Sequence, residues 1–353
     1  MTNPRNSPSR FSSRRSFLRN GAGAAAAFAA GAPFIRAEDK SGLKNPILGS
    51  GEHTYECIHD WGELPNGIVY GNTHGAAEDS QGRIYVMHTV HRTSPKADAI
   101  VVFDADGKFV KSWGADFKGG AHGMHLANEG GAEFLYLCDT ARHMVVKTTL
   151  DGEVVWQRGC PEGTGGYKRT EEYVPTNVAT APDGTVFVAD GYGRNYIHIY
   201  KADGTYVSTF GGSGKEPGHT SCPHGLLVDI RGPEPLLVVA DRTNARLQYF
   251  TLKGEHVRFV TDELRAPCHF HAHGGNLLIP DLNSRVTVFD KDNRLITHLG
   301  DGGGYEGVRN QPRTAFKAGQ FVAPHSGIFD RNGNIFIVEW VEVGRVTKLK
   351  KIV

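Results

Sequence analysis

The sequence has no excess of charge of either sign, since 39 lysine and arginine residues balance 38 aspartate and glutamate residues and the formal net charge is +1. This balance gives no field to attract nucleic acid or a membrane surface, so neither partner is predicted. Only five cysteines occur, which leaves at least one unpaired and gives no legible disulfide framework. Long hydrophobic runs are also missing, because residues 21–31 are too few and too rich in alanine and glycine to span a bilayer.

The first 37 residues have the organisation of a twin-arginine signal peptide. Residues 13–18 (SRRSFL) supply the arginine pair, the weakly apolar run follows, and a cleavage position lies after Ala37. This predicts export of a folded, cofactor-loaded chain to the periplasm or the extracellular space, with no stable membrane insertion after cleavage. Residues 38–53 are predicted to be a linker.

Glycine is abundant, with 45 residues, and many of them occupy turn pairs such as Asp183-Gly184 and Asn332-Gly333. Such pairs are typical of β-hairpins. The sequence therefore predicts an all-β protein.

A repeated unit continues from residue 54 to residue 353. Its equivalent positions are separated by 48, 54, 48, 44 and 57 residues, and they are His74, His122, Thr176, His224, Cys268 and His325. This is the period of four-stranded propeller blades. In the third unit, strands are predicted at 177–180, 185–189, 196–200 and 205–210. The last unit is one strand short, so residues 54–62 are predicted to pair beside 344–353 and close one six-bladed β-propeller.

Three of these equivalent positions predict a metal site. His122, His224 and His325 occupy alternate units, so in a six-bladed ring they surround one central point. Three imidazoles with an open fourth position are typical of catalytic zinc, and another divalent transition metal stays open. Other residues near this point keep open roles as alternative ligands, hydrogen-bond donors to the ligands or rim residues, and these are His74, Cys268, His269, His271 and His273.

Two further residues are predicted to reach the same pocket from the loops after the second strands. Tyr192 lies between two glycines, and a phenol near a cation is suited to general-base work. Arg242 is placed to hold a carboxylate with its planar guanidinium. The alternatives are a packing or rim role for the tyrosine and a salt bridge between blades for the arginine.

Three segments together resemble peptidyl-α-hydroxyglycine α-amidating lyase, within the NHL-repeat six-bladed propellers. They are Asp190-Gly191-Tyr192, Cys222-Pro223-His224, and residues 239–248 (VADRTNARLQ). The resemblance implies three zinc-binding histidines, a tyrosine base and a substrate-positioning arginine, which are His122, His224, His325, Tyr192 and Arg242 here. The reaction implied is cleavage of a carbinolamide N–C bond, with release of an amide and glyoxylate.

The sequence also departs from that family. The family has an arginine of the first blade near the metal, whereas residues 86–89 read VMHT and only Arg92 is nearby. Ser326 stands where the family has an acidic calcium ligand, which argues against structural calcium. Gly193 replaces the cysteine next to the family's tyrosine.

The favoured hypothesis is an exported, metal-dependent lyase that acts on a small-molecule or peptide substrate in the central mouth of the propeller. The alternative is a non-catalytic NHL-repeat propeller that binds a peptide or a polymer, because one fold hosts many functions. A gluconolactonase-like enzyme is a third hypothesis, but that related propeller family uses mainly acidic and asparagine metal ligands, and no such set is apparent. The sequence does not define the oligomeric state.

Overall fold

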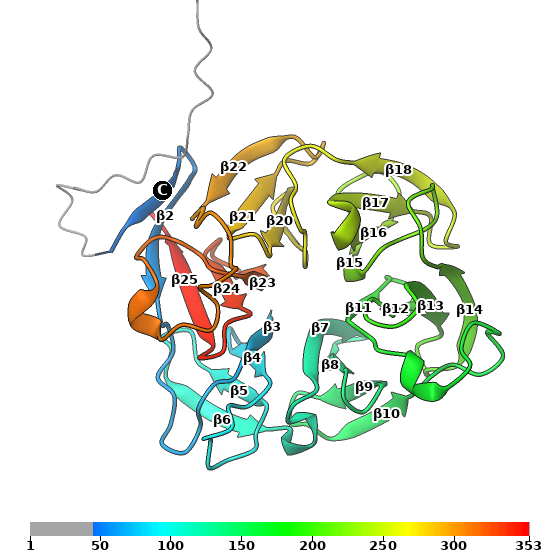
Figure 1. Cartoon of the computed structure of the whole chain (residues 1–353), viewed down its shortest axis with the longest axis horizontal. Coiled ribbons are helices and arrows are strands. Elements are labelled where there is room, and N and C mark those ends of the chain that lie inside the picture. The colour runs from blue at the N-terminus through cyan, green and yellow to red at the C-terminus, as the bar shows by residue number, and fades with distance from the viewer. Residues whose placement is uncertain (1–44, 353) are drawn as a thin grey trace, which may run out of the picture. The chain divides into compact units, whose positions relative to one another are not determined.

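The computed structural model describes residues 45–352, and these residues form six antiparallel β-sheets arranged as blades around a central axis (Figure 1). The predicted six-bladed propeller is therefore confirmed. The predicted signal peptide lies outside the described residues, as does the first part of the predicted linker. No helix within residues 45–352 is long and apolar enough to cross a membrane.

Each blade begins with its innermost strand. Blade one contains β3 (Thr73–Glu78), β4 (Ile84–His88), β5 (Ile100–Phe103) and β6 (Phe109–Trp113). Blade two contains β7 (Ala121–Glu129), β8 (Ala132–Asp139), β9 (Met144–Thr149) and β10 (Val154–Arg158). Blade three contains β11 (Asn177–Thr180), β12 (Val186–Ala189), β13 (Tyr196–Tyr200) and β14 (Tyr206–Gly211). Blades four and five contain β15 (Pro223–Asp229), β16 (Leu236–Asp241), β17 (Arg246–Phe250), β18 (His256–Val260); and β19 (His271–His273), β20 (Asn276–Asp281), β21 (Arg285–Phe289), β22 (Leu295–Leu299). Short 3-10 helices lie in connecting loops at η1 (Ala115–Phe117), η2 (Thr170–Glu172), η3 (Arg242–Asn244) and η4 (Arg313–Ala315).

Blade six joins both ends of the repeat. Its strand order is β1 (Ile47–Ser50), β2 (His53–His59), β25 (Arg345–Lys351), β24 (Ile335–Glu339) and β23 (Pro324–Phe329). β2 pairs antiparallel with β25, with Cys57 opposite Leu349, which confirms the predicted closure. The additional strand β1 lies in the segment predicted as a linker and forms a hairpin with β2.

The hydrophobic core is divided among the interfaces between blades. Six clusters of buried side chains each combine residues from two neighbouring blades. Between blades one and two, for example, Met87 of β4 packs with Leu137 of β8. Because every sheet buries both faces in this way, the innermost strands are held rigidly around the axis.

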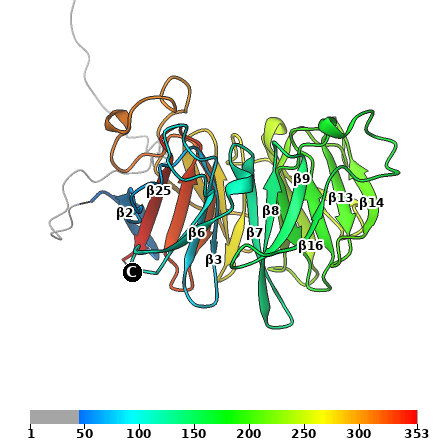
Figure 2. The same ribbon diagram turned by 90° about the horizontal axis from the view of Figure 1, so that it is seen from below.

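The loops on one face of the ring differ in length. A long connection between β22 and β23, residues 300–323, carries η4 and stands above the blades as the orange segment in Figure 2. It accounts for the largest spacing in the repeat, the 57 residues between Cys268 and His325.

Candidate metal centre

Four histidines meet where the innermost strands begin. His122 is the second residue of β7, His224 of β15 and His325 of β23, in blades two, four and six. Their ring centroids are 4.9 Å (His122 to His224), 4.8 Å (His122 to His325) and 4.7 Å (His224 to His325) apart. The three predicted ligands are thus brought together in a nearly equilateral triangle, as their alternate positions require.

Backbone carbonyls orient these three rings in the same way. In each ring the Nδ1 atom bonds the carbonyl oxygen of the next blade's equivalent residue, at 2.8 Å, 2.8 Å and 2.9 Å for Thr176, Cys268 and His74 respectively. A carbonyl oxygen only accepts, so each Nδ1 carries the hydrogen and each Nε2 keeps its lone pair. An N–H held by a backbone carbonyl is the arrangement that orients metal-binding histidines.

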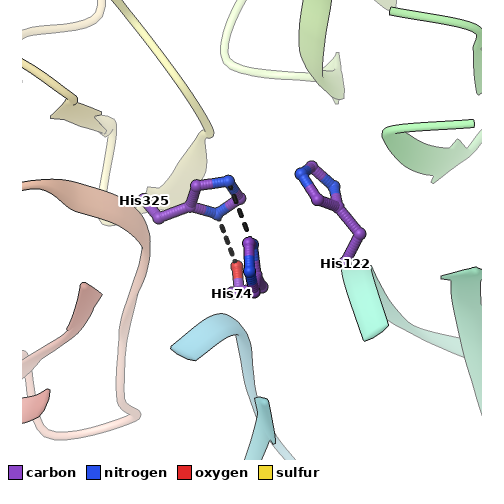
Figure 3. Close-up of side chains that lie close together, drawn as sticks. All are labelled: His74, His122 and His325. Atoms are coloured by element: carbon purple, nitrogen blue, oxygen red, sulfur yellow. Dashed lines mark hydrogen bonds between the residues drawn. The ribbon is translucent and has the colours of Figure 1, made fainter. Parts of the chain in front are cut away.

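His74 is the fourth member of the cluster, from β3 of blade one. Its Nδ1 lies 3.2 Å from Nε2 of His325 (Figure 3), and one donor nitrogen from each of His74, His122 and His325 falls within 4.8 Å of the others. This set contains His74 where the predicted set contains His224. We favour His224, because its Nδ1 is held by a carbonyl as in the other two rings.

The histidine cluster is buried, and burial decides its charge. Desolvation lowers the pKa of His122 to about 4, although the Thr176 carbonyl raises it. Burial is also the main cause that holds the pKa values of His74, His224 and His325 well below the ordinary value, and the neighbouring imidazoles add to the effect. Charges of Arg309 and Arg242 lower the pKa of His74 further. Neutral imidazoles are the form that binds a metal ion.

Tyr192 places its hydroxyl oxygen between two of these rings. The oxygen is 3.1 Å from Nε2 of His122 and 3.0 Å from Nε2 of His224. The hydroxyl has one hydrogen, so it can donate to only one of these two Nε2 lone pairs at a time. Tyr192 is 42% exposed, while its hydroxyl lies against two buried histidines.

Arg242, in η3, stands behind the tyrosine. Its Nη1 donates to the Tyr192 hydroxyl at 3.4 Å, and its guanidinium carbon lies 5.4 Å from the centre of the tyrosine ring. Burial raises the pKa of Tyr192 to about 12, and the Arg242 charge acts in the opposite direction. Both residues predicted from the second-strand loops therefore lie at the histidine cluster.

Two glycines let the Tyr192 loop approach its neighbours. A Cβ atom on Gly191 would lie 2.3 Å from the Pro223 carbonyl oxygen, and one on Gly193 would lie 2.1 Å from a carboxylate oxygen of Asp190. Real Cβ atoms do not come so close to other atoms. Both positions therefore need glycine because there is no room for a Cβ atom, and not because of a positive φ angle.

The acidic residues at the ends of the second strands have structural roles. Asp190 accepts from the backbone amides of Val174 and Arg194, and Asp241 accepts from that of Ser221. The same pattern recurs in Asp281, which accepts from the amide of Arg265, and in Glu339, which accepts from that of Val322. These carboxylates hold the loops that lead into the innermost strands. Within residues 45–352, Tyr192 and Arg242 are the residues of the second-strand loops that lie at the histidine cluster.

The other residues with open roles are separated by the structure. The Cys268 thiol is buried 4.0 Å from Nη1 of Arg242, and burial raises its pKa to about 12. His269 and His271 line a different cavity of about 290 Å³, together with His125.

Arg309 is the residue at the site that sequence reasoning missed. It comes from the long loop before β23, donates from Nη2 to Oδ1 of Asn72 at 3.2 Å, and lies over the Trp340 ring at 3.3 Å. No motif marks it, although the long spacing before His325 indicates an insertion.

Comparisons with known proteins support the family resemblance. The chain is 27% identical over 264 residues to peptidyl-α-hydroxyglycine α-amidating lyase 1 of Drosophila melanogaster, covering 64% of this chain and 47% of that protein. It is 26% identical over 201 residues to a probable peptidyl-α-hydroxyglycine α-amidating lyase of Caenorhabditis elegans, covering 54% and 56%. The chain thus spans about half the length of these relatives. The resemblance predicted from the sequence is confirmed at this level.

A third relative is peptidyl-glycine α-amidating monooxygenase A of Xenopus laevis, 31% identical over 160 residues, which cover 43% of this chain and 16% of that protein. No family model matches the chain. Among solved structures, a streptogramin B lyase superposes with a TM-score of 0.56 at 14% identity, covering 83% of this chain and 97% of the other. A virginiamycin B lyase of Staphylococcus aureus gives 0.53 at 15% identity, covering 84% and 100%. These two likenesses concern the fold alone.

Proposed function

We propose that this chain is a metal-dependent lyase that cleaves the N–C bond of a carbinolamide, such as a peptidyl-α-hydroxyglycine. The observation that carries the proposal is the Tyr192 hydroxyl between the Nε2 atoms of His122 and His224, because it puts a proton-transfer group beside three lone pairs oriented alike. The lyase relatives support the same chemistry.

The donor set fits zinc. His122, His224 and His325 would hold the ion through Nε2, because Nδ1 of each is occupied by a carbonyl. A zinc ion bound to three histidines acts as a Lewis acid and lowers the pKa of an oxygen that it binds. Ser326 follows the last ligand, so we do not propose calcium beside it.

In the proposed reaction Tyr192 carries out both proton transfers. In its phenolate form Tyr192 takes the proton from the substrate hydroxyl, whose O–H electron pair becomes the carbonyl bond of glyoxylate. The C–N pair moves onto nitrogen, and Tyr192 returns the proton there, so an amide leaves. The Arg242 charge favours the phenolate, since it lowers the pKa that burial raises.

We also propose that residues 1–37 direct export by the twin-arginine route, so that the lyase acts in the periplasm or the extracellular space. Support comes from the order of the arginine pair, the apolar run and the cleavage position. Antibody detection of the chain in cell fractions, with an Arg14→Lys, Arg15→Lys variant as control, tests this part.

Turnover is tested by glyoxylate release from a peptide capped with α-hydroxyglycine, with the metal-stripped protein as control. Release that requires metal supports the lyase. If no peptide of a varied set gives glyoxylate above the control, the non-catalytic binding propeller becomes the better hypothesis.

Metal binding is tested by elemental analysis of protein purified without a histidine tag. We expect one zinc ion per chain, lost when His122 and His224 are both changed to alanine, because two of three ligands are removed. His74→Ala should keep the ion, which separates the two ligand sets. Full zinc in the double variant would refute the site.

A further inference from the structure

Arg309 lies in the long loop 300–323 and is held against Asn72, two residues before His74. Its Nε donates to the Trp340 carbonyl oxygen at 3.4 Å and its Nη2 to Oδ1 of Asn72 at 3.2 Å. The Trp340 ring supports the guanidinium face at 3.3 Å, and the backbone amide of Glu342 donates to the Arg309 carbonyl oxygen at 3.1 Å. The arginine is therefore fixed in orientation rather than free in solvent.

Arg309 forms no salt bridge among residues 45–352. Burial lowers its pKa, although the exposed Glu342 carboxylate is near enough to raise that pKa in opposition. The acceptors of Arg309 are a neutral amide and a carbonyl. By contrast, Arg246 pairs with Asp241 at 2.6 Å and Arg345 pairs with Glu339. A guanidinium has five N–H donors, so three remain on Arg309, including both on Nη1.

Arg309 and Arg242 flank the histidines from different blades. Asn72, which anchors Arg309, lies two residues before His74 at the start of blade one. Arg242 belongs to blade four, and blades one and four are opposite in a ring of six. Arg242 is already directed at the Tyr192 hydroxyl, which leaves Arg309 with open donors beside the site.

We propose that Arg309 binds the substrate's carboxylate, and that Arg242 acts on Tyr192 instead of serving as the clamp predicted from the sequence. The inference rests on the proposed function and specifies its substrate class as carboxylates that reach from the histidine cluster toward blade one. The fixed guanidinium fork matches a carboxylate, and its orientation on Trp340 reduces the entropy lost on binding.

Binding without turnover tests this inference. Calorimetric titration of the purified, untagged chain compares N-acetylglycine with N-acetylglycinamide, which lacks the charge. We expect the carboxylate to bind about 10- to 100-fold more tightly, the usual range for a charge-assisted hydrogen bond. Arg309→Gln should abolish that preference, and Arg309→Lys should restore part of it. Zinc content and melting temperature should stay unchanged.

Two further variants locate the effect. Arg92→Gln removes an exposed blade-one charge and should keep the preference, and Arg242→Gln should keep it while slowing glyoxylate release. The inference is overturned if Arg309→Gln weakens the binding of both ligands equally, or if the unaltered chain shows no preference for the carboxylate. It is also overturned if the preference is lost in Arg92→Gln or in Arg242→Gln and not in Arg309→Gln. A preference that depends on Arg309 without any glyoxylate release would refute the lyase and leave the carboxylate site in place.

Discussion

The Tyr192 hydroxyl is the single group on which the proposed chemistry depends. Tyr192→Phe removes the oxygen and leaves the ring, so we expect turnover to fall about 10²- to 10⁴-fold, the usual contribution of a positioned acid or base. Zinc content should be retained, because Tyr192 is not among the three ligands. Steady-state glyoxylate release and elemental analysis measure the two effects.

Tyr173→Phe is the matched control, since that hydroxyl is buried without a hydrogen-bond partner and lies outside the cluster. Turnover equal to that of the unaltered chain in Tyr192→Phe would exclude the base role.

Gly191 sets the position of the same tyrosine. Gly191→Ala introduces a Cβ atom 2.3 Å from the Pro223 carbonyl oxygen, so the loop must shift. We expect glyoxylate release to fall at least tenfold, because displacements near 1 Å can cost about 10²-fold in rate. Gly232→Ala, with its nearest atom at 3.9 Å, is the control. Unchanged kinetics in Gly191→Ala would show that the loop adapts without moving the hydroxyl.

At the scale of strands, the pairing of β2 with β25 closes the ring. Leu349 of β25 is fully buried opposite Cys57 of β2, in the cluster between blades five and six. Leu349→Ala should lower the free energy of unfolding by about 2–5 kcal/mol, the usual cost of truncating a core leucine. Urea denaturation measures this, with Val154→Ala in the outer strand β10, where Val154 is 58% exposed, as control. A loss no larger than that of the control would mean that the closing strand is not cooperative with the ring.

Strands with strong patterns were predictable from the sequence. The predicted strands 177–180 and 196–200 coincide with β11 and β13, because alternation and asparagine or aspartate turns mark both. β1 was missed, since four residues that include Gly49 carry little pattern and acquire strand structure only by pairing with β2. β19 begins at His271, later than the equivalent position Cys268, and only an isolated bridge between Pro267 and Asp281 precedes it.

Residues of the site were predictable where the repeat placed them. The convergence of His122, His224 and His325 follows from their alternate blades. The nearness of His74 follows from the same repeat, since it occupies the equivalent position of blade one. The contact between Arg242 and Tyr192 and the position of Arg309 depend on the geometry of non-repeating loops, and Arg309 comes from an insertion that belongs to one blade.

For the whole molecule, buried histidines predict sensitivity to acid. Burial lowers the pKa of His88 and of His198 from 6.5 to about 3. The unfolded chain therefore binds more protons between pH 6.5 and pH 3, so stability is complete above pH 6.5 and falls as the pH decreases through this window. Each such histidine contributes at most about 1.4 kcal/mol per pH unit.

Urea denaturation at pH 7.5, 6 and 5 measures this slope. His198→Gln should make the loss between pH 7.5 and pH 5 smaller than in the unaltered chain, because one titrating group is removed. His219, which is exposed, is the control site. An identical pH dependence in His198→Gln would contradict the assignment.

Blade six also determines when the histidine cluster can assemble during synthesis. A ribosome completes the β1–β2 hairpin early, and β2 has only β1 beside it until β25 emerges almost three hundred residues later. His325 is translated in the same final stretch as β25, so the last histidine of the cluster and the closing strand arrive together. A chain that stops before this stretch thus lacks both the closed ring and the complete histidine cluster, and the proposed ion could be held only once this stretch has been made.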